Sequence, residues 1–489
     1  MLKQSLDEIR KIAAEYTAIP VSREIYADIR TPIALLKSIR SISSRCYLLE
    51  SVEGGEVWGR YSFLGFDPVT QVTCKDGDIE IRNGTVIKMT GRRPEDVIRE
   101  MLAQYKVPRF DDLPPFAGGL VGYFSYDFIT YFEDKLKLKA VDETGFKDFD
   151  LMLFDKVIAY DHLRQKIIII VNVRTDNLEA NYRKAAFEID GIVRMIRESL
   201  PPEEGRTKLL SDVRSDMSQE EYESMVEKAR EYIVDGDIFQ VVLSRRFKAE
   251  MEGSLLDAYR VLRTTNPSPY MFYIRTDELE IAGTSPETLV KLQNGKLSTY
   301  PLAGTRPRGR TPEEDARLEA ELLTDDKELS EHNMLVDLGR NDLGKISKFG
   351  SVSVENYLQI LRFSHVMHIA SVVNSRIRED KDALDAIISV LPAGTLSGAP
   401  KIRACQIIDE LEPVRRGIYG GAIGYIDFAG NMDTCIGIRL AVKKGDTVYV
   451  QAGAGIVADS VPETEFRECE NKARAVIDAL AMAEEVEVQ

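Results

Sequence analysis

Two pairs of glutamates have a spacing that suits a metal site. Glu328 and Glu331 lie three residues apart in a predicted helix, and Glu465 and Glu468 repeat this arrangement in the last predicted helix. Residues three apart share one face of a helix, so each pair sets two carboxylates side by side. Spacing alone favours two solvated helix faces. If both pairs faced one cavity they would suit Mg2+, which takes oxygen ligands and usually only one or two carboxylates.

Two glycine-rich segments are weaker signals of anion binding. Residues 339–346 approximate a nucleotide-binding P-loop, but Ile346 stands where a Ser or Thr would hold magnesium, so we reject that reading. Residues 451–456 follow a predicted strand and lack the third glycine of a dinucleotide fingerprint. They indicate either close strand packing or a loop whose backbone approaches an anionic ligand.

Histidines are few. Among the four, His365 and His368 fall in a strand-like run and should lie on opposite faces, so at most one faces a site. A hydrogen-bonded core histidine is the ordinary alternative.

Capping and turn signals predict the elements that position these residues. Residues 1–40 indicate two helices, the second opened by Thr31-Pro32. The segments 218–221 and 311–314 are capping-box patterns, and each predicts the start of a helix. The helix that begins at residues 311–314 is predicted to run towards Asp337. Further helices are predicted at about 93–105, 177–200, 399–411 and 462–484, strands at 150–161, 165–173 and through 419–457, and hairpins at 76–77, 83–84 and 294–295.

Pro201 and Pro202 open the best linker candidate in the chain. They place the main boundary near residues 205–217, with an N-terminal domain over residues 1–205 and a second domain over 218–489. The predicted class is α+β, with large mixed or antiparallel sheets.

Composition narrows the class of protein. The 489 residues include 80 acidic and 64 basic side chains, and the net charge of −16 disfavours nucleic acids and membrane surfaces as partners. The five cysteines form no CxxC pair, so neither a disulfide framework nor a zinc site is indicated. No apolar stretch is long enough to span a membrane, and the N-terminal segment lacks the apolar core of a signal peptide. We expect a soluble, cytoplasmic protein.

The second half resembles the chorismate-utilising enzymes, most closely the large subunits of anthranilate synthases. The resembling segments, in the family's order, are residues 301–309, 328–344, 363–369, 391–404, 419–439 and 451–473. The resemblance implies the family's α+β fold of large sheets flanked by helices. It also implies a Mg2+-dependent lyase that converts chorismate and ammonia to anthranilate and pyruvate. This is the first committed step of tryptophan biosynthesis and is feedback-inhibited by L-tryptophan.

Two positions separate members of this family. Relatives that add water to chorismate use a lysine base where this chain has Gln240, whose amide cannot deprotonate water; ammonia needs no such base. Aminodeoxychorismate synthases carry a nucleophilic lysine where this chain has Ala303. Both departures favour the anthranilate branch. The alternatives are aminodeoxychorismate synthase component I, a water-using isochorismate or salicylate synthase, and a non-catalytic amino-acid-binding regulator.

The resemblance also implies roles for individual residues. Mg2+ would be held by Glu331 and Glu468, with Glu328 and Glu465 behind them, and would take the ring carboxylate of chorismate. Glu287 would be the general acid for the C4 hydroxyl, and it should be buried or near other acids to raise its pKa. His368 would assist proton removal at C2, and we assign His365 to packing. The remaining substrate contacts implied are Gly304, Thr305 (also a catalytic candidate), Tyr419, Arg439, Gly453 and Gly455.

An inhibitor site is implied in the first half. Residues 48–51 and 266–271 resemble the two walls that bind tryptophan in this family, and the residues concerned are Leu49, Glu50, Ser51, Pro269, Tyr270 and Met271. Glu50 would accept the ligand's ammonium group, and Tyr270 and Met271 would line an apolar slot. An ordinary strand and turn are the alternative. Aminodeoxychorismate synthases also bind tryptophan there, so these residues alone do not establish feedback inhibition.

The reaction implied by the resemblance needs a source of ammonia. The sequence shows no Gly-x-Cys-x-Gly loop with downstream His and Glu, so hydrolysis of glutamine by the usual cysteine route is not expected. The resemblance therefore implies a separate glutamine amidotransferase subunit, anthranilate synthase component II, commonly in a heterotetramer.

Overall fold

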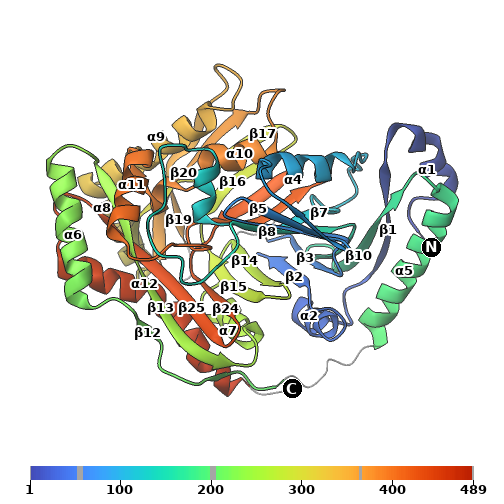
Figure 1. The fold of residues 1–489 in the computed structure, drawn as a ribbon, viewed down its shortest axis with the longest axis horizontal. Helices are drawn as coiled ribbons and strands as arrows, with labels where there is room; N and C mark the ends of the chain where they lie inside the picture. The colour runs from blue at the N-terminus through green and yellow to red at the C-terminus, as the bar shows by residue number, and fades with distance from the viewer. Residues whose placement is uncertain (1, 52–58, 199–204, 363–365, 487–489) are drawn as a thin grey trace.

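The computed structural model describes residues 2–51, 59–198, 205–362 and 366–486. Two large antiparallel sheets form the centre of the molecule, with helices packed around them (Figure 1). The predicted α+β class with large sheets is confirmed. Within the described ranges, no helix is long and apolar enough to cross a membrane.

The first sheet has 13 strands. Its path runs through β1 (Ala18–Tyr26), β10 (Lys166–Arg174), β9 (Lys156–Asp161), β3 (Tyr61–Phe66), β2 (Cys46–Glu50), β14 (Tyr270–Arg275), β15 (Leu279–Ser285), β24 (Leu440–Lys444), β25 (Thr447–Ile456), β13 (Gln240–Glu252) and β11 (Lys208–Leu209). Two short strands, β12 (Arg214–Ser215) and β21 (Gly398–Ala399), also pair with β13.

The second sheet has 12 strands. Its path runs through β18 (Leu302–Pro307), β20 (Val366–Arg376), β17 (Lys296–Thr299), β16 (Thr288–Gln293), β23 (Met432–Ile436), β22 (Ala422–Asp427), β7 (Gly119–Phe124), β8 (Phe149–Phe154), β4 (Thr70–Lys75), β5 (Asp78–Arg82) and β6 (Val86–Met89). The strand β19 (Ser353–Arg362) pairs with β20.

Both sheets combine strands from the two sides of the expected boundary. In the first sheet β2 pairs with β14, opposing Glu50 to Met271, and in the second β7 pairs with β22. A division into residues 1–205 and 218–489 therefore separates the chain in sequence but not in space. The prolines Pro201 and Pro202 lie outside the described residues. They mark a chain connection, whereas strand pairing decides which segments pack together.

The helices among the described residues are α1 (Leu6–Ile12), α2 (Pro32–Arg40), α4 (Pro94–Ala103), α5 (Leu178–Glu198), α6 (Gln219–Val234), α7 (Leu256–Thr265), α8 (Pro312–Leu322), α9 (Asp326–Gly344), α10 (Ala383–Val390), α11 (Lys401–Leu411) and α12 (Pro462–Met482). Short 3-10 segments include η1 (Ala13–Glu15), η2 (Tyr126–Tyr131), η3 (Gly394–Leu396) and η4 (Ala483–Glu485). The capping box predicted at Ser218 is present, and the three predicted hairpins form between β4 and β5, β5 and β6, and β16 and β17.

Four local predictions were wrong. The prediction of helix only over residues 1–40 missed β1, whose first five residues are all buried and show no alternation. The helix begun at Thr311 does not run to Asp337, because Asp325 accepts from the backbone of Lys327 and Glu328 and starts a new helix there. The strand predicted at 150–161 is two strands, since the chain crosses from one sheet to the other between β8 and β9. Thr311 caps α8, but the Glu314 carboxylate accepts from Arg310 rather than completing a capping box.

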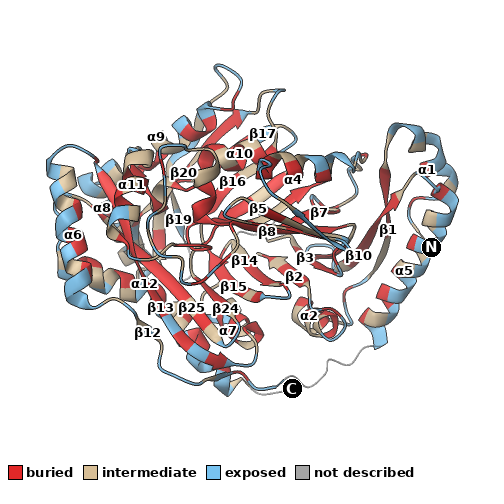
Figure 2. Ribbon diagram, in the orientation of Figure 1, coloured by how far each residue is buried: buried red, intermediate tan, exposed pale blue. Residues whose placement is uncertain are grey.

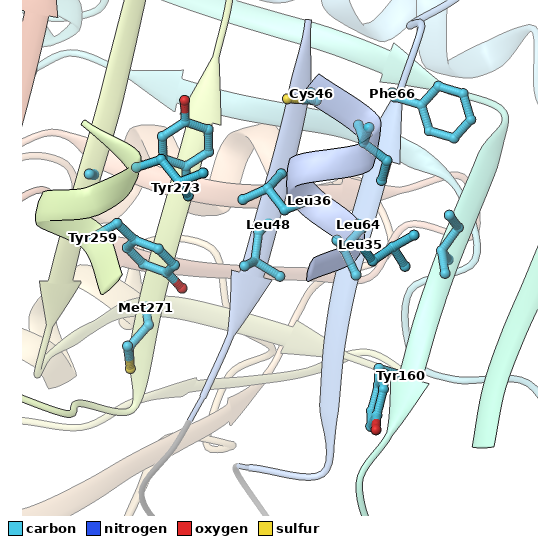
Figure 3. Packing of buried hydrophobic residues seen from close by; sticks show 14 of the residues in the cluster. Leu35, Leu36, Cys46, Leu48, Leu64, Phe66, Tyr160, Tyr259, Met271 and Tyr273 are labelled. Atoms are coloured by element: carbon cyan, nitrogen blue, oxygen red, sulfur yellow. The ribbon is translucent and has the colours of Figure 1, made fainter. Parts of the chain in front are cut away.

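Apolar layers between and outside the sheets hold the sheets and helices together. Side chains from both sheets, among them Tyr47 and Phe154 in edge-on contact at 4.8 Å between ring centroids, fill the layer between the sheets. The helices α2, α5, α7 and α12 pack on the first sheet, and α4, α9 and α10 pack on the second. Figure 2 shows buried residues concentrated on the central strands, with exposed residues along the outer helix faces. Figure 3 shows Leu36 of α2 beside Leu48 of β2.

A buried ion pair ties the segment before β22 to the first sheet. The guanidinium of Arg416 bonds Glu412 at 2.6 Å and the carbonyls of Leu396 and Val242 at 2.6 and 2.7 Å. Removing one partner of a buried pair leaves an uncompensated charge and typically costs about 3–5 kcal/mol. We expect Arg416→Met to lower the free energy of unfolding by about that amount, measured by urea denaturation.

The matched control is Arg340→Met, which removes the exposed partner of Asp337 on α9. An exposed pair contributes about 0–1 kcal/mol, so this control should unfold close to the parent. Equal urea midpoints for the two variants would contradict the account of Arg416.

Candidate active site

The residues predicted for the substrate converge between the two sheets and helices α9 and α12. Gly304 lies on β18, and a Cβ atom there would lie 3.2 Å from Glu328 Oε2 of α9. Gly453 lies on β25, and a Cβ atom there would lie 2.9 Å from the Tyr419 hydroxyl. Segments that are far apart in sequence therefore lie side by side at these two glycines.

Glu287 lies between β15 of the first sheet and β16 of the second. Its backbone carbonyl accepts from the Ile436 N–H at 3.0 Å, and its Oε1 accepts from the Thr395 hydroxyl at 3.1 Å. Desolvation raises the pKa of Glu287 to about 8, although Thr395, Arg439 and Lys472 each act to lower it. The carboxyl group is therefore mainly protonated at neutral pH, which is the state that a general acid requires.

His368 lies on β20 opposite Thr305 of β18. Its Nδ1 is 3.0 Å from the Gly304 carbonyl and 3.0 Å from the Thr305 hydroxyl. The carbonyl can only accept, so we assign the proton to Nδ1 and the ring's lone pair to Nε2. Burial and the charge of Arg439 lower the pKa of His368, although the Gly304 carbonyl opposes this. A neutral imidazole of this kind can act as a base.

Gly304 has a conformation that suits glycine at this position. Its φ is +69°, in the left-handed region, and a Cβ atom would lie only 3.0 Å from Leu322 as well as close to Glu328. A larger residue would therefore meet both strain and crowding. The carbonyl that holds His368 depends on this backbone conformation.

Arg439 lies where the chain passes from β23 of the second sheet to β24 of the first. Its φ is +51°, uncommon for a residue with a side chain, and its carbonyl accepts from the Thr284 N–H at 3.1 Å. The positive charge acts to lower the pKa of both Glu287 and His368. The guanidinium therefore lies within electrostatic reach of the two candidate catalytic groups, where it can hold a carboxylate.

The two glutamate pairs lie within electrostatic reach of one another, as the family resemblance implies and as their spacing alone did not favour. Burial and then Glu328 raise the pKa of Glu331, with a further contribution from Glu468 on the other helix. Burial and then Glu468 likewise raise the pKa of Glu465, which is itself buried. Carboxylates from α9 and α12 therefore share one region.

The charges of this glutamate cluster are only partly balanced by cations. Arg306 bonds Glu328 at 3.3 Å, and Lys472 pairs with Glu468 at 2.6 Å. Across the part of the chain that the structure describes, no three metal-ligating side chains are close enough to enclose an ion. Magnesium needs only one or two carboxylates and completes its shell with water, so Glu331 and Glu468 fit it in number and type.

Two functional candidates were missed in the sequence: Thr395, which bonds Glu287, and Lys472, which donates to the Gly453 carbonyl at 3.1 Å. Lys472 follows Glu468 by four residues, a spacing that could have indicated a helix ion pair. Thr395 has no signal in the sequence apart from its place in the resembling segment 391–404. Gln240, which the sequence singled out only because it stands where water-using relatives carry lysine, also bonds Glu331. His365, expected to pack in the core, lies outside the described residues.

A second cavity, of about 500 Å3, lies between the sheets. All six residues predicted for tryptophan line it: Leu49, Glu50, Ser51, Pro269, Tyr270 and Met271. The Glu50 carboxylate already accepts from Arg263 at 2.5 Å and Tyr259 at 2.9 Å. A second carboxylate in the lining, that of Asp433, pairs with Lys291 at 3.0 Å.

Comparisons with known proteins agree with this arrangement. A sequence model of the family described as chorismate binding enzyme matches residues 44–478. The chain is 49% identical over 498 residues to anthranilate synthase component 1 of Acetivibrio thermocellus, covering 99% of this chain and 100% of that one. It is 47% identical over 496 residues to the Aquifex aeolicus protein of the same name, covering 99% of each chain.

The fold comparison gives the same result. The crystal structure of anthranilate synthase component I from Streptococcus pneumoniae superposes with a TM-score of 0.76 at 37% identity, covering 93% of this chain and 99% of that chain. Sequence, fold and site geometry lead to one assignment: the chain belongs to the chorismate binding enzyme family.

Proposed function

We propose that this chain is the chorismate-converting component of an anthranilate synthase, which forms anthranilate and pyruvate from chorismate and ammonia. The observation that carries the proposal is the position of the Glu287 carboxyl, whose pKa burial raises to about 8, within electrostatic reach of Arg439, which also acts on His368, and of Lys472, the partner of Glu468. The names of the relatives support this reading, as do Gln240 and Ala303 at the two positions where water-using and aminodeoxychorismate-forming enzymes carry lysine.

Residues of this chain would bind and orient chorismate before reaction. Arg439 and Tyr419 would hold the enolpyruvyl carboxylate, and the backbone at Gly304 and Gly455 would complete the anion pocket. Glu331 and Glu468 would hold Mg2+, with Glu328 and Glu465 behind them, and the ion when bound supplies positive charge for the ring carboxylate.

Two proton transfers follow from the positions of Glu287 and His368. As ammonia forms its bond to C2, Glu287 donates its proton to the C4 hydroxyl, which leaves as water. His368 then accepts the C2 proton through Nε2, the ring aromatises, and the C3–O bond breaks to release enolpyruvate, which takes up a proton to become pyruvate. The pKa shifts of both residues have the direction that these roles need.

We infer that ammonia comes from a partner glutamine amidotransferase subunit. All five cysteines of the chain are buried, and burial raises the pKa of Cys74 and Cys469 to about 11. A buried thiol that stays protonated is a poor nucleophile. The chain therefore lacks a cysteine suited to glutamine hydrolysis. The cavity lined by Glu50 and Tyr270 is the proposed site of feedback inhibition by L-tryptophan.

The test uses the purified full chain with chorismate, Mg2+ and a high concentration of an ammonium salt near pH 8, where free ammonia is present and Glu287 still keeps part of its proton. We expect anthranilate fluorescence to appear only when all three are present, and L-tryptophan to suppress it. A non-fluorescent aminochorismate product would instead identify an aminodeoxychorismate synthase. Absence of any turnover by folded protein would favour an amino-acid-binding regulator and overturn the proposal.

A further inference from the structure

The inhibitor cavity and the candidate active site share strands. Cys435 of β23 lines the cavity, and the next residue, Ile436, donates its N–H to the Glu287 carbonyl at 3.0 Å. Tyr270 of β14 lines the same cavity and pairs in register with Ser285, two residues before Glu287. The backbone of Glu287, the general-acid candidate, is therefore held close to β23 and β14, and both strands also line the cavity.

A directed row of hydrogen bonds runs along this wall. The Thr288 hydroxyl lies 2.9 Å from the Tyr270 hydroxyl, which in turn lies 2.7 Å from Asp433 Oδ1. The carboxylate can only accept, so Tyr270 donates to Asp433 and Thr288 donates to Tyr270. Lys291 completes the row through its ion pair with Asp433. Because Thr288 directly follows Glu287, the row ends at the backbone of the general-acid candidate.

Within the described ranges, the Glu287 backbone has few other restraints. The Ser285 hydroxyl makes only long contacts of 3.4 and 3.5 Å with it. The pairing of β16 with β23 begins with Thr288 opposite Cys435 and shifts register before Val290, so the ladder is interrupted directly after Thr288. A displacement of the Thr288 side chain would therefore act on the adjacent Glu287 backbone at an irregular end of the ladder.

We propose that Tyr270 is a positioning residue for Glu287, acting through Thr288, and that a ligand in the cavity inhibits by displacing the Tyr270 hydroxyl. The regulatory part rests on the tryptophan inhibition proposed above. An aromatic amino acid is suited to this action in two ways. Its ring packs on the Tyr270 ring, and its charged groups compete for Asp433 and Lys291, on which the hydroxyl depends.

The decisive variant is Tyr270→Phe, which keeps the ring in the cavity and removes only the hydroxyl. We expect kcat with ammonia to fall roughly tenfold, as for loss of one hydrogen bond to a charged group, while KM for chorismate changes less than about twofold. Tryptophan should still bind, as measured by calorimetry. The fraction of activity retained at saturating tryptophan should rise roughly tenfold, because occupancy no longer moves Thr288.

Two further comparisons separate positioning from general damage. Tyr61→Phe removes another hydroxyl from the same cavity lining and should keep full inhibition. Thr288→Val should reproduce Tyr270→Phe, whereas Thr288→Ser, which keeps the hydroxyl, should restore inhibition.

The outcomes distinguish this inference from the proposed function. Tryptophan binding to Tyr270→Phe with inhibition as complete as in the parent would overturn the link through Tyr270 and leave the proposed function intact. No tryptophan binding to the parent chain would overturn the proposed feedback inhibition itself, and with it the regulatory part of this inference.

Discussion

Replacing Glu287 with glutamine is expected to lower kcat with ammonia by about 10²–10⁴-fold, the usual contribution of a positioned general acid. Glutamine keeps the size of the side chain and can still bond Thr395, but it has no acidic proton for the C4 hydroxyl. Chorismate should bind nearly as before, because the carboxyl group is placed for the reacting oxygen rather than for the substrate carboxylates. Anthranilate fluorescence measures turnover, and calorimetry measures chorismate binding.

The pH profile gives an independent check on the same residue. Burial raises the pKa of Glu287 to about 8, and the proton donor is the acid form, so kcat should fall as pH rises through about 8. Thr395, Arg439 and Lys472 face this carboxyl and act against the rise. Rates must be compared at constant free ammonia, because the free base also increases with pH. The falling limb should be absent in Glu287→Gln.

Glu278→Gln is the matched control, because this exposed glutamate on the β14–β15 hairpin undergoes the same chemical change away from the site. It should keep the parent rate and the parent pH profile. If Glu287→Gln retained more than about a tenth of the parent kcat, Glu287 would not be the general acid.

Features that depend on local chemistry could be predicted from the sequence. The capping box at Ser218 and the Asn294-Gly295 hairpin need only a few neighbouring residues, and both are present. The strand β1 was missed because its buried first half has no alternation to mark one exposed face. The sharing of both sheets between the two halves depends on pairings such as β2 with β14, and no local pattern encodes these.

The candidate site also combines features that local sequence spacing reveals with features that only tertiary packing creates. Each glutamate pair could be seen from its spacing, but the two pairs meet only because α9 and α12 pack around the same region. Their convergence, like the position of Arg439 at the crossing between sheets, follows from tertiary packing. Family resemblance supplied these assignments where spacing alone favoured two separate surfaces. Even so, it did not indicate that Arg263 already pairs with Glu50 in the proposed tryptophan cavity.

Replacing Glu331 with glutamine should separate metal binding from folding. Loss of one proposed ligand is expected to lower activity more than about 100-fold, because an ion at this position contributes several kcal/mol. The parent should be stabilised by Mg2+, by about 2.7 kcal/mol at an ion concentration of 100 times Kd, and this stabilisation should largely disappear in the variant. Thermal unfolding with and without Mg2+ measures it independently of turnover.

Without Mg2+, the same substitution should leave the melting temperature unchanged or raise it, rather than lower the stability of the protein. Burial and the neighbouring carboxylates raise the pKa of Glu331 above its value in the unfolded chain. Its ionisation therefore costs stability as pH rises through the folded-state pKa, and glutamine avoids that cost. At neutral pH without Mg2+, Glu331→Gln should melt at or above the temperature of the parent.

The control Asp337→Asn, an exposed acid on the same helix, should change neither melting temperature nor Mg2+ response. A variant that melts lower than the parent without metal would show that Glu331 supports the fold, whereas loss of only the Mg2+ response identifies it as a ligand.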